Sequence, residues 1–174
     1  MHLEAYQAVG SMVEASGLRL DGGTLLGLDI GGRDVNGTAR AWFGPDTTWH
    51  GLDIRPGPGV DIVADATTWT APTALWDVVL STECLEHVQE WPGIIYAAST
   101  ALDPAGPQLV FITAASTGRG AHGASGEHVP PEGEWYGNVT QEELGAELDR
   151  WFEFTAVRYN PNPGDVYAWA QGVR

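Results

Sequence analysis

The stretch that decides the fold is Leu25-Leu26-Gly27-Leu28-Asp29-Ile30-Gly31-Gly32, an apolar run that carries an aspartate and ends in two glycines. Such a run is typical of a strand that is buried on both faces of a parallel sheet. A second run ends at Asp53, and a third leads to Asp65. Ligands of open α/β sheets bind outside the carboxyl ends of the strands, so we expect these carboxylates to line one nucleoside pocket.

The rest of the chain continues as strands that alternate with helices. A helix is expected over residues 1–17, and the capping box Thr140–Glu143 predicts another to about Arg150. A longer helix is expected from about Glu83 to Leu102, bent or broken at Trp91-Pro92 because proline lacks a hydrogen-bond donor. The expected strands cover 24–30, 48–53, 60–63, 75–81, 108–113, 152–159 and 166–173. This order predicts an α/β, doubly wound, mostly parallel sheet with helices on both faces and an antiparallel pair of strands at its C-terminus.

One long segment, residues 114–139, has no periodicity, is rich in glycine and contains two adjacent prolines. A structureless loop of this length inside a compact domain is usually functional or disordered, so we interpret it as an active-site loop. No internal repeat or linker divides the chain, and its 174 residues fit one domain. A single domain over 1–174 is therefore expected.

Charge and cysteine content exclude several classes of protein. The formal net charge is −15 with only eight Lys and Arg residues, which disfavours DNA or RNA as a partner. Cys84 is the only cysteine, so no internal disulfide can form and a reducing compartment is expected. No apolar run approaches the roughly 20 residues that span a bilayer, and residues 1–17 lack the pattern of a signal peptide. We expect a cytoplasmic protein that contacts no membrane, and the oligomeric state stays open.

These segments together resemble the class I S-adenosylmethionine-dependent methyltransferases over roughly residues 24–173. The resemblance rests on the glycine-rich first motif, on the acidic ends of the next two strands, and on the fourth strand with the segment after it: Leu26–Gly32, Gly51–Ile54, Val63–Ala66, Leu75–Ser81 and Glu83–Val88. It implies a Rossmann-like sheet of seven strands with an antiparallel C-terminal strand. It also implies S-adenosylmethionine as the cofactor.

The resemblance implies a set of cofactor-binding residues whose roles also make physical sense. Asp53 is placed to accept both ribose hydroxyls, and glycines let the backbone approach the cofactor closely. Asp65 can accept from the adenine amino group, with the amide of Ala66 donating to the ring. The full set is Asp29, Gly31, Gly32, Asp53, Ile54, Asp65, Ala66, Thr82, Glu83 and His87. A further glycine that is usual in the first motif is absent, because Arg33 and Val35 stand in that register.

Other readings of the same residues stay open. A glycine pair after a strand is often only a turn, and Glu83 can be a helix N-terminal acid. Nicotinamide cofactors also use an acid after the second strand, but residues 31–36 do not supply G-x-G-x-x-G. We expect no metal: one cysteine rules out a cysteine-based zinc site, and the spacing of His122, Glu127 and His128 matches no familiar pattern.

The expected function is transfer of a methyl group to an oxygen or nitrogen atom of a small-molecule acceptor. His122 or His128, both in the long loop, is the candidate general base because imidazole titrates near neutral pH. The alternative for each is a solvated loop histidine. The alternative for the whole chain is an inactive S-adenosylmethionine-binding domain that acts as a regulatory or partner module.

Overall fold

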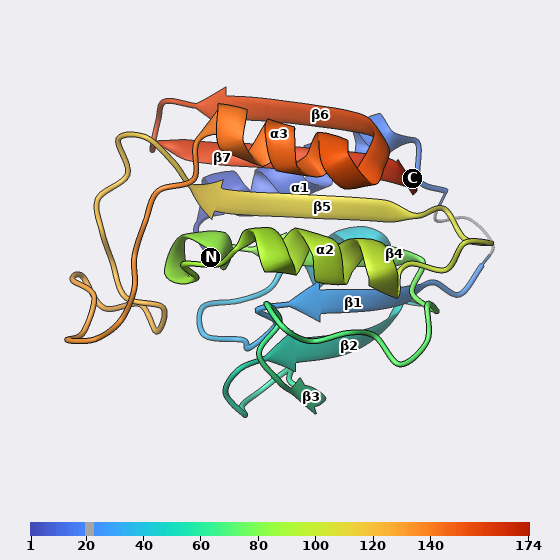
Figure 1. Ribbon diagram of the computed structural model, residues 1–174, viewed down its shortest axis with the longest axis horizontal. Helices are drawn as coiled ribbons and strands as arrows, with labels where there is room; N and C mark the ends of the chain where they lie inside the picture. The colour runs from blue at the N-terminus through green and yellow to red at the C-terminus, as the bar shows by residue number, and fades with distance from the viewer. Residues whose placement is uncertain (20–22) are drawn as a thin grey trace.

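A seven-stranded sheet forms the centre of the protein, and the computed structural model describes residues 1–19 and 23–174 (Figure 1). The strand order is β3-β2-β1-β4-β5-β7-β6, and only β7 runs antiparallel to its neighbours. The strands are β1 (Leu26–Ile30), β2 (Thr48–Asp53), β3 (Ile62–Val63), β4 (Val78–Thr82), β5 (Leu109–Ala115), β6 (Phe152–Asn160) and β7 (Asp165–Val173). The predicted fold class is confirmed.

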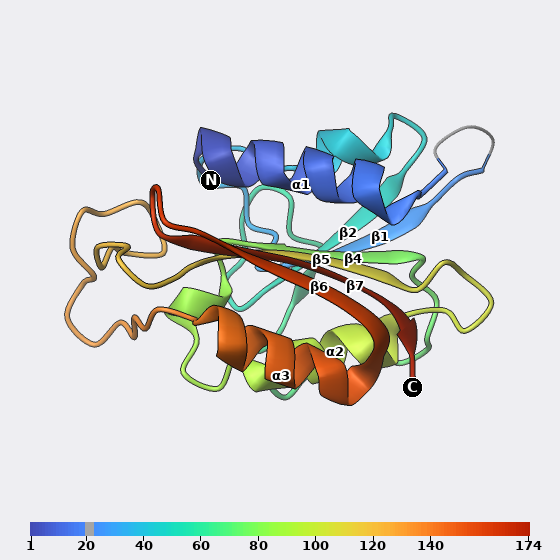
Figure 2. The same ribbon diagram turned by 90° about the horizontal axis from the view of Figure 1, so that it is seen from above.

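Helices cover both faces of this sheet (Figure 2). On one face lie the helix α1 (Leu3–Ser16) and the short 3-10 helix η1 (Arg40–Phe43), and on the other lie α2 (Pro92–Ala101) and α3 (Gln141–Trp151). α3 begins at the predicted capping box, in which Thr140 accepts from the Glu143 amide and the Glu143 carboxylate accepts from the Thr140 amide. None of the described helices has the length and apolar composition needed to cross a bilayer.

The core has two layers because successive side chains of a strand point to opposite faces of the sheet. In β5, Val110 and Ile112 belong to the layer under α2 and α3, whereas Leu109 and Phe111 belong to the layer under α1. The strand is buried over its whole length. Its continuous apolar sequence therefore reflects burial on both faces, as expected for the centre of such a sheet.

The prediction of a helix from Glu83 is wrong in its first half. Glu83 has a φ of 52°, a three-residue 3-10 helix η2 (Leu85–His87) follows, and Val88 is extended. The regular helix starts only at Pro92, since proline suits the first helical position, where no hydrogen-bond donor is needed. The amide of Gly137 donates to the carbonyl of Glu86 (2.8 Å), so the long loop holds the segment in its non-helical form.

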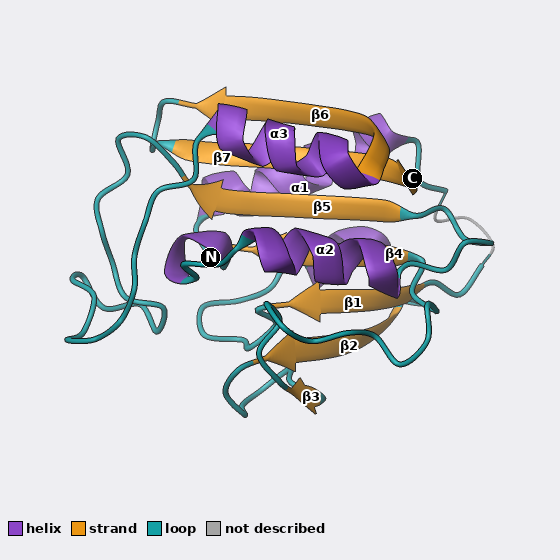
Figure 3. Ribbon diagram, in the orientation of Figure 1, coloured by secondary structure: helices purple, strands orange, loops and turns teal. Residues whose placement is uncertain are grey.

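Several predicted boundaries also shift. Strand β3 is only two residues long, and β1 begins at Leu26 rather than at residue 24. Strand β5 extends to Ala115, whose carbonyl accepts from the amide of buried Val139 (2.9 Å), so the long loop starts at residue 116 rather than 114. This loop extends from the end of the molecule toward which the arrowheads of β1, β2 and β5 point (Figure 3).

The order of the strands places a crevice at this end of the sheet. The chain passes outward from β1 to β2 and β3, and then returns to β4 on the other side of β1. Connections that leave β1 and β4 in opposite directions leave space between them at their carboxyl ends. The fold thus predicts a ligand site between the segments that follow β1, β2 and β4.

Candidate functional site

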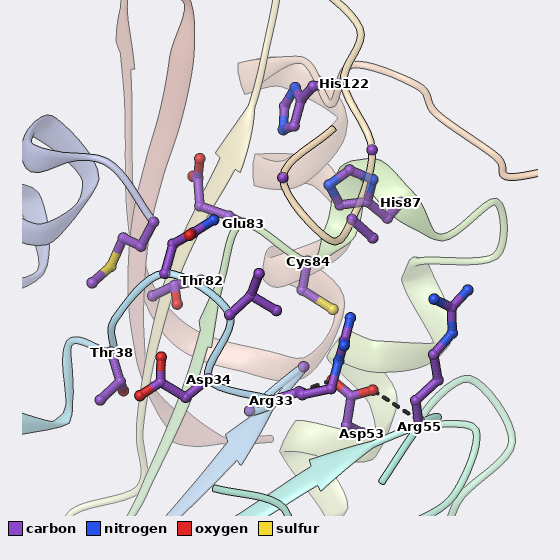
Figure 4. Close-up of a pocket in the computed structure, with 18 of the residues that line it drawn as sticks. Arg33, Asp34, Thr38, Asp53, Arg55, Thr82, Glu83, Cys84, His87 and His122 are labelled. Carbon is purple, nitrogen blue, oxygen red and sulfur yellow. Dashed lines mark hydrogen bonds between the residues drawn. The ribbon is translucent and has the colours of Figure 1, made fainter. Parts of the chain in front are cut away.

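A cavity of about 410 Å³ lies at the carboxyl ends of β1, β2 and β4, with part of the long loop as one wall. Figure 4 shows Asp53 at one end of this cavity, His87 and His122 at the other, and Cys84 between them. Most residues predicted to bind the cofactor line it, and these are Asp29, Gly31, Gly32, Asp53, Ile54, Thr82, Glu83 and His87. The structure therefore brings together residues that are distant in the sequence.

Among the described residues, Asp65, Ala66 and His128 do not line the cavity. Asp65 is exposed after β3, and its Oδ1 accepts from the amide (2.9 Å) and the hydroxyl (2.7 Å) of Thr67. His128 is also exposed, whereas His122 faces the cavity. The two loop histidines, equivalent in the sequence, are thus in different environments.

The packing around the turn after β1 requires glycine at both of its positions, even without a ligand. Gly31 has a φ of +76°, and a Cβ atom there would lie 2.6 Å from the sulfur of Cys84. A Cβ atom on Gly32 would lie 2.6 Å from the carbonyl oxygen of Asp29. Both glycine amides donate to the carbonyl of Leu52 (2.8 and 3.1 Å), which fixes the turn against β2. Side chains at either position would therefore displace the turn from the cavity.

Asp29 and Arg40 hold this turn in place. The Nε atom of Arg40 donates to the buried carboxylate of Asp29 (2.8 Å), and its Nη2 atom donates to the carbonyls of Gly32 (3.2 Å) and Gly59 (2.9 Å). Burial raises the pKa of Asp29 to about 6, while the charge of Arg40 opposes this increase. Arg40 therefore links the carboxylate of Asp29 to the backbone of the glycine turn. Arg40 had no predicted role, because only the tertiary structure brings η1 beside β1.

Asp53, at the end of β2, presents its carboxylate to the cavity. Its Oδ2 accepts from the amide of Arg33 (3.3 Å) and its Oδ1 from the amide of Arg55 (2.9 Å), as the dashed lines of Figure 4 show. A carboxylate has about four acceptor sites, so each oxygen keeps capacity for a hydroxyl donor. Two backbone amides therefore orient the carboxylate of Asp53, and its remaining acceptor sites stay available to a ligand.

The other end of the cavity contains a cluster that the sequence did not predict. Glu86 is fully buried, and within the described part of the chain neither of its carboxylate oxygens has a hydrogen-bond partner. Burial raises the pKa of Glu86 to about 8. The Nε2 atom of His122 lies 4.0 Å from Glu86 Oε1, and the rings of His87 and His122 lie 5.1 Å apart. Burial and the proximity of His122 lower the pKa of His87 to about 4, so this ring is neutral at pH 7.

The sequence contained one signal for this cluster. Glu86 and His87 are adjacent within the segment Glu83–Val88 that carries the resemblance. Glu86 nevertheless had no predicted role, because a helix was expected there and helical geometry would not place its side chain against a loop. The 3-10 turn and the contact with Gly137 decide its direction.

Glu83 and the N-terminal segment form the remaining wall. The Nε2 atom of His2 lies 3.1 Å from carboxylate oxygens of both Glu83 and Asp165, and Arg119 donates to Asp165 (2.6 Å). Hydrogen bonds with Asp165 and then Glu83 raise the pKa of His2 to about 10. The carboxylate of Glu83 also accepts from the hydroxyl of Thr113 (3.2 Å). Glu83 thus lines the cavity as a partnered charge.

Comparisons with known proteins agree with this architecture. No family model matches the sequence, and no curated protein matches it. Solved structures do match, among them a 1,6-didemethyltoxoflavin-N1-methyltransferase from Burkholderia thailandensis with bound S-adenosylhomocysteine. It is 18% identical, with a TM-score of 0.66 over 98% of this chain and 79% of that one.

Two further structures are similar to the same extent. An S-adenosylmethionine-dependent methyltransferase from Mesorhizobium loti is 17% identical, with a TM-score of 0.62 over 94% of this chain and 97% of that one. The N-terminal domain of EvdMO1 was determined in the presence of S-adenosylhomocysteine and D-fucose. It is 15% identical, with a TM-score of 0.63 over 98% of this chain and 84% of that one. The chain therefore has the fold of the class I S-adenosylmethionine-dependent methyltransferases.

Proposed function

We propose that the protein binds S-adenosylmethionine and transfers its methyl group to an oxygen or nitrogen atom of a small-molecule acceptor. One observation carries the proposal: the glycine turn and the Asp53 carboxylate face one cavity at the point where the strand order reverses. Two of the similar structures were determined with S-adenosylhomocysteine, the demethylated form of this cofactor. Both binding and transfer are inferred for this chain from its own site residues.

The residues around the cavity suggest how the cofactor is held. Asp53 accepts the two ribose hydroxyls, and Ile54, which is 64% exposed at the rim, offers apolar surface to the adenine. Asp65 and Ala66 stay proposed for the adenine edge, because β3 is the next strand beyond β2. The methionine half passes the Gly31–Gly32 turn toward Thr82, Glu83 and His87, which line the same cavity.

The cofactor supplies a methyl group on a sulfonium, which an acceptor displaces in line. The chain must then align the acceptor and remove its proton. We assign the assistance in proton removal to His122, which lines the cavity, and not to His128, which is exposed outside it. The long loop, residues 116–139, would cover the acceptor and exclude water, as closing loops commonly do.

A small molecule is the class of acceptor that fits best. The charge of −15 disfavours nucleic acid, and part of the long loop lines the acceptor end of the cavity. Two of the similar structures were determined with a small molecule present, 1,6-didemethyltoxoflavin in one and D-fucose in the other. Both support a small molecule as the class of acceptor.

Calorimetry with S-adenosylhomocysteine tests the cofactor site. Loss of the Asp53 carboxylate leaves two ligand hydroxyls unpaired, so Asp53→Ala should weaken binding by roughly 1–3 kcal/mol, or about 5- to 150-fold. Asp46→Ala, which removes an exposed carboxylate outside the cavity, should bind like the wild type. Equal affinity in the wild type and in folded Asp53→Ala would contradict the assignment.

Transfer itself is tested with a labelled methyl donor and a panel of hydroxylated and aminated small molecules. Incorporation of the label into at least one compound is the expected result. Cofactor binding without transfer to any member of a broad panel would favour the regulatory or partner module instead. Absence of cofactor binding would refute both.

A further inference from the structure

We propose that Glu86, His87 and His122 form a binding site for one divalent first-row transition-metal ion in the wall of the cavity. One ligand atom from each of the three side chains lies within 4.8 Å of the other two. Ligand atoms of a tetrahedral site with bonds of about 2.1 Å lie about 3.4 Å apart, so a contraction of at most about 1.4 Å closes the site. The three residues come from η2 and from the long loop, so the fold itself creates the group.

The strongest observation is that two members of the group have buried polar atoms with unmet hydrogen-bonding capacity. Within the described part of the chain, both carboxylate oxygens of Glu86 and the Nδ1 atom of His87 are buried without a hydrogen-bond partner. Buried polar groups in proteins are normally hydrogen-bonded or coordinate a metal ion. Of the described residues with such atoms, Glu86 and His87 are the two with ionisable side chains, and both belong to the cluster, which is explained if a cation completes it.

His122 is already oriented as a ligand. Its Nδ1 atom lies 3.1 Å from the carbonyl oxygen of Gly120, and because a carbonyl only accepts, Nδ1 carries the hydrogen. In the neutral ring the lone pair is then on Nε2, which is the atom that lies 4.0 Å from Glu86. Metal-binding histidines typically donate their second ring hydrogen to a carbonyl or carboxylate in this way.

Neighbouring acids are less suitable as ligands. The carboxylate of Glu83 is already bound by His2 and Thr113, and Glu134 lies 3.8 Å from His87 but accepts from the amide of Ala124. The residues considered from the sequence, Glu127 and His128, are exposed. The assignment therefore departs from the expectation of no metal and uses a different set of residues.

The ligand set indicates which ions fit. Two imidazoles and one carboxylate suit Zn²⁺, Co²⁺, Fe²⁺ or Mn²⁺ better than Mg²⁺ or Ca²⁺, which prefer oxygen ligands. Three protein ligands leave at least one coordination position open. His87 and His122 both line the cavity, so we expect that position to face it.

This placement also deepens the proposed function, on which the following step rests. A hydroxyl of the acceptor could occupy the open position, and the ion would lower the pKa of that hydroxyl so that its proton would pass to solvent. The lone pair of His122 is then used in coordination, so its assistance in proton removal acts through the ion. Binding of the ion itself requires neither cofactor nor acceptor.

The experiment titrates chelator-treated protein with Co²⁺ alone and with Zn²⁺ alone, followed by visible absorption and by calorimetry. The wild type should bind one ion per chain and give the d–d bands of a low-symmetry Co²⁺ site. Glu86→Gln, which keeps the shape of the side chain, and His122→Ala should each weaken binding at least tenfold. His128→Ala, a histidine change in the same loop but outside the cluster, should bind like the wild type.

Circular dichroism establishes that each variant is folded, and NMR of the wild type gives a test that needs no variant. Bound Co²⁺ should shift the ring-proton signals of His87 and His122 strongly and those of His50 and His128 little. No saturable binding by the wild type, unchanged affinity in folded Glu86→Gln, or equal shifts for all four rings would overturn the site. S-adenosylhomocysteine titrated into the same metal-free protein separates this outcome from failure of the proposed function.

Discussion

The two ends of the cavity differ in whether a buried carboxyl group has a partner. At the glycine-turn end, the buried carboxylate of Asp29 is paired with Arg40, and the same guanidinium donates to two backbone carbonyls. At the far end, the carboxylate of Glu86 is equally buried, but no described residue donates a hydrogen bond to it. Both environments raise the pKa of the carboxyl group, to about 6 and to about 8.

From this difference we infer that Asp29 has a structural role and that Glu86 has a role in ligand binding. A buried carboxylate beside a cation can keep its charge, whereas a buried carboxyl group without a partner is mostly protonated near neutral pH unless a bound cation supplies the partner. The buried charge of the glycine-turn end is therefore paired before any ligand binds, and we propose that this end receives the cofactor through Asp53. We propose that the far end is completed by a bound metal ion.

The largest expected effect is on catalysis at the far end. General-base assistance contributes about 10²- to 10⁴-fold, so His122→Ala should reduce turnover by roughly this factor. Its affinity for S-adenosylhomocysteine should barely change, and His128→Ala should retain normal turnover. The measurement is steady-state methyl transfer to an acceptor identified from the panel. Similar turnover in both variants would show that the far end only positions the acceptor.

The next largest effect is on stability at the glycine-turn end. Arg40→Met leaves the carboxylate of Asp29 buried without its cation and should cost about 3 kcal/mol of unfolding free energy. Arg150→Met removes an exposed guanidinium from Glu147, which keeps the hydrogen bond from Trp151, so it should cost less than about 1 kcal/mol. Urea denaturation measures both.

The double variant Asp29→Asn with Arg40→Met sharpens this prediction. It removes the charge together with its partner, so it should be more stable than Arg40→Met alone. If the single and double variants unfold at the same urea concentration, the pair does not behave as a buried charge pair. The contrast between the two ends would then be lost.

A smaller, pH-dependent effect is expected from His2, which pairs with Asp165 and Glu83. Because the pKa of His2 is raised to about 10 in the folded protein, its pairing stabilises fully below about pH 6.5. That contribution is lost as the pH rises through 10. Urea denaturation between pH 7 and 10 should therefore show a decline of about 1–2 kcal/mol that His2→Gln lacks. The same decline in His2→Gln would assign it to other groups.

The smallest effect concerns the contact that joins the glycine turn to the long loop. The guanidinium of Arg33 donates to the hydroxyl of Ser125 (2.9 Å). Loss of this hydrogen bond in Arg33→Ala should cost about 0.5–1.5 kcal/mol of local stability, so amide exchange in the loop should accelerate roughly two- to twelvefold. Arg55→Ala, whose side chain makes no hydrogen bond to the loop among the described contacts, is the control.

Ligands should act on the same loop in the opposite direction. Cofactor and acceptor together should slow its amide exchange, because the loop would close over both. Full protection of residues 116–139 in the ligand-free protein would contradict a loop that closes on binding. The long loop would then be fully ordered at the far end of the cavity before any ligand binds.

The sequence alone determined the framework end of the site. Buried strands and the residues at their ends are local features, so the run before Gly31 and the carboxylate of Asp53 could be recognised without knowing what packs against them. Because parallel strands meet at one edge, their order predicted that both would face a single cavity. The third such carboxylate, Asp65, follows a strand of only two residues and does not line that cavity.

Only the tertiary structure decided the partners of the buried charges. Arg40 reaches Asp29 because η1 packs beside β1, and Glu86 points inward because a contact with the long loop replaces the expected helix. The same packing distinguishes His122 from His128, two histidines with no difference in local sequence signal. The physical reason is that periodicity reports which face of an element is buried, whereas a pair or cluster of polar atoms depends on segments that folding alone brings within bonding distance.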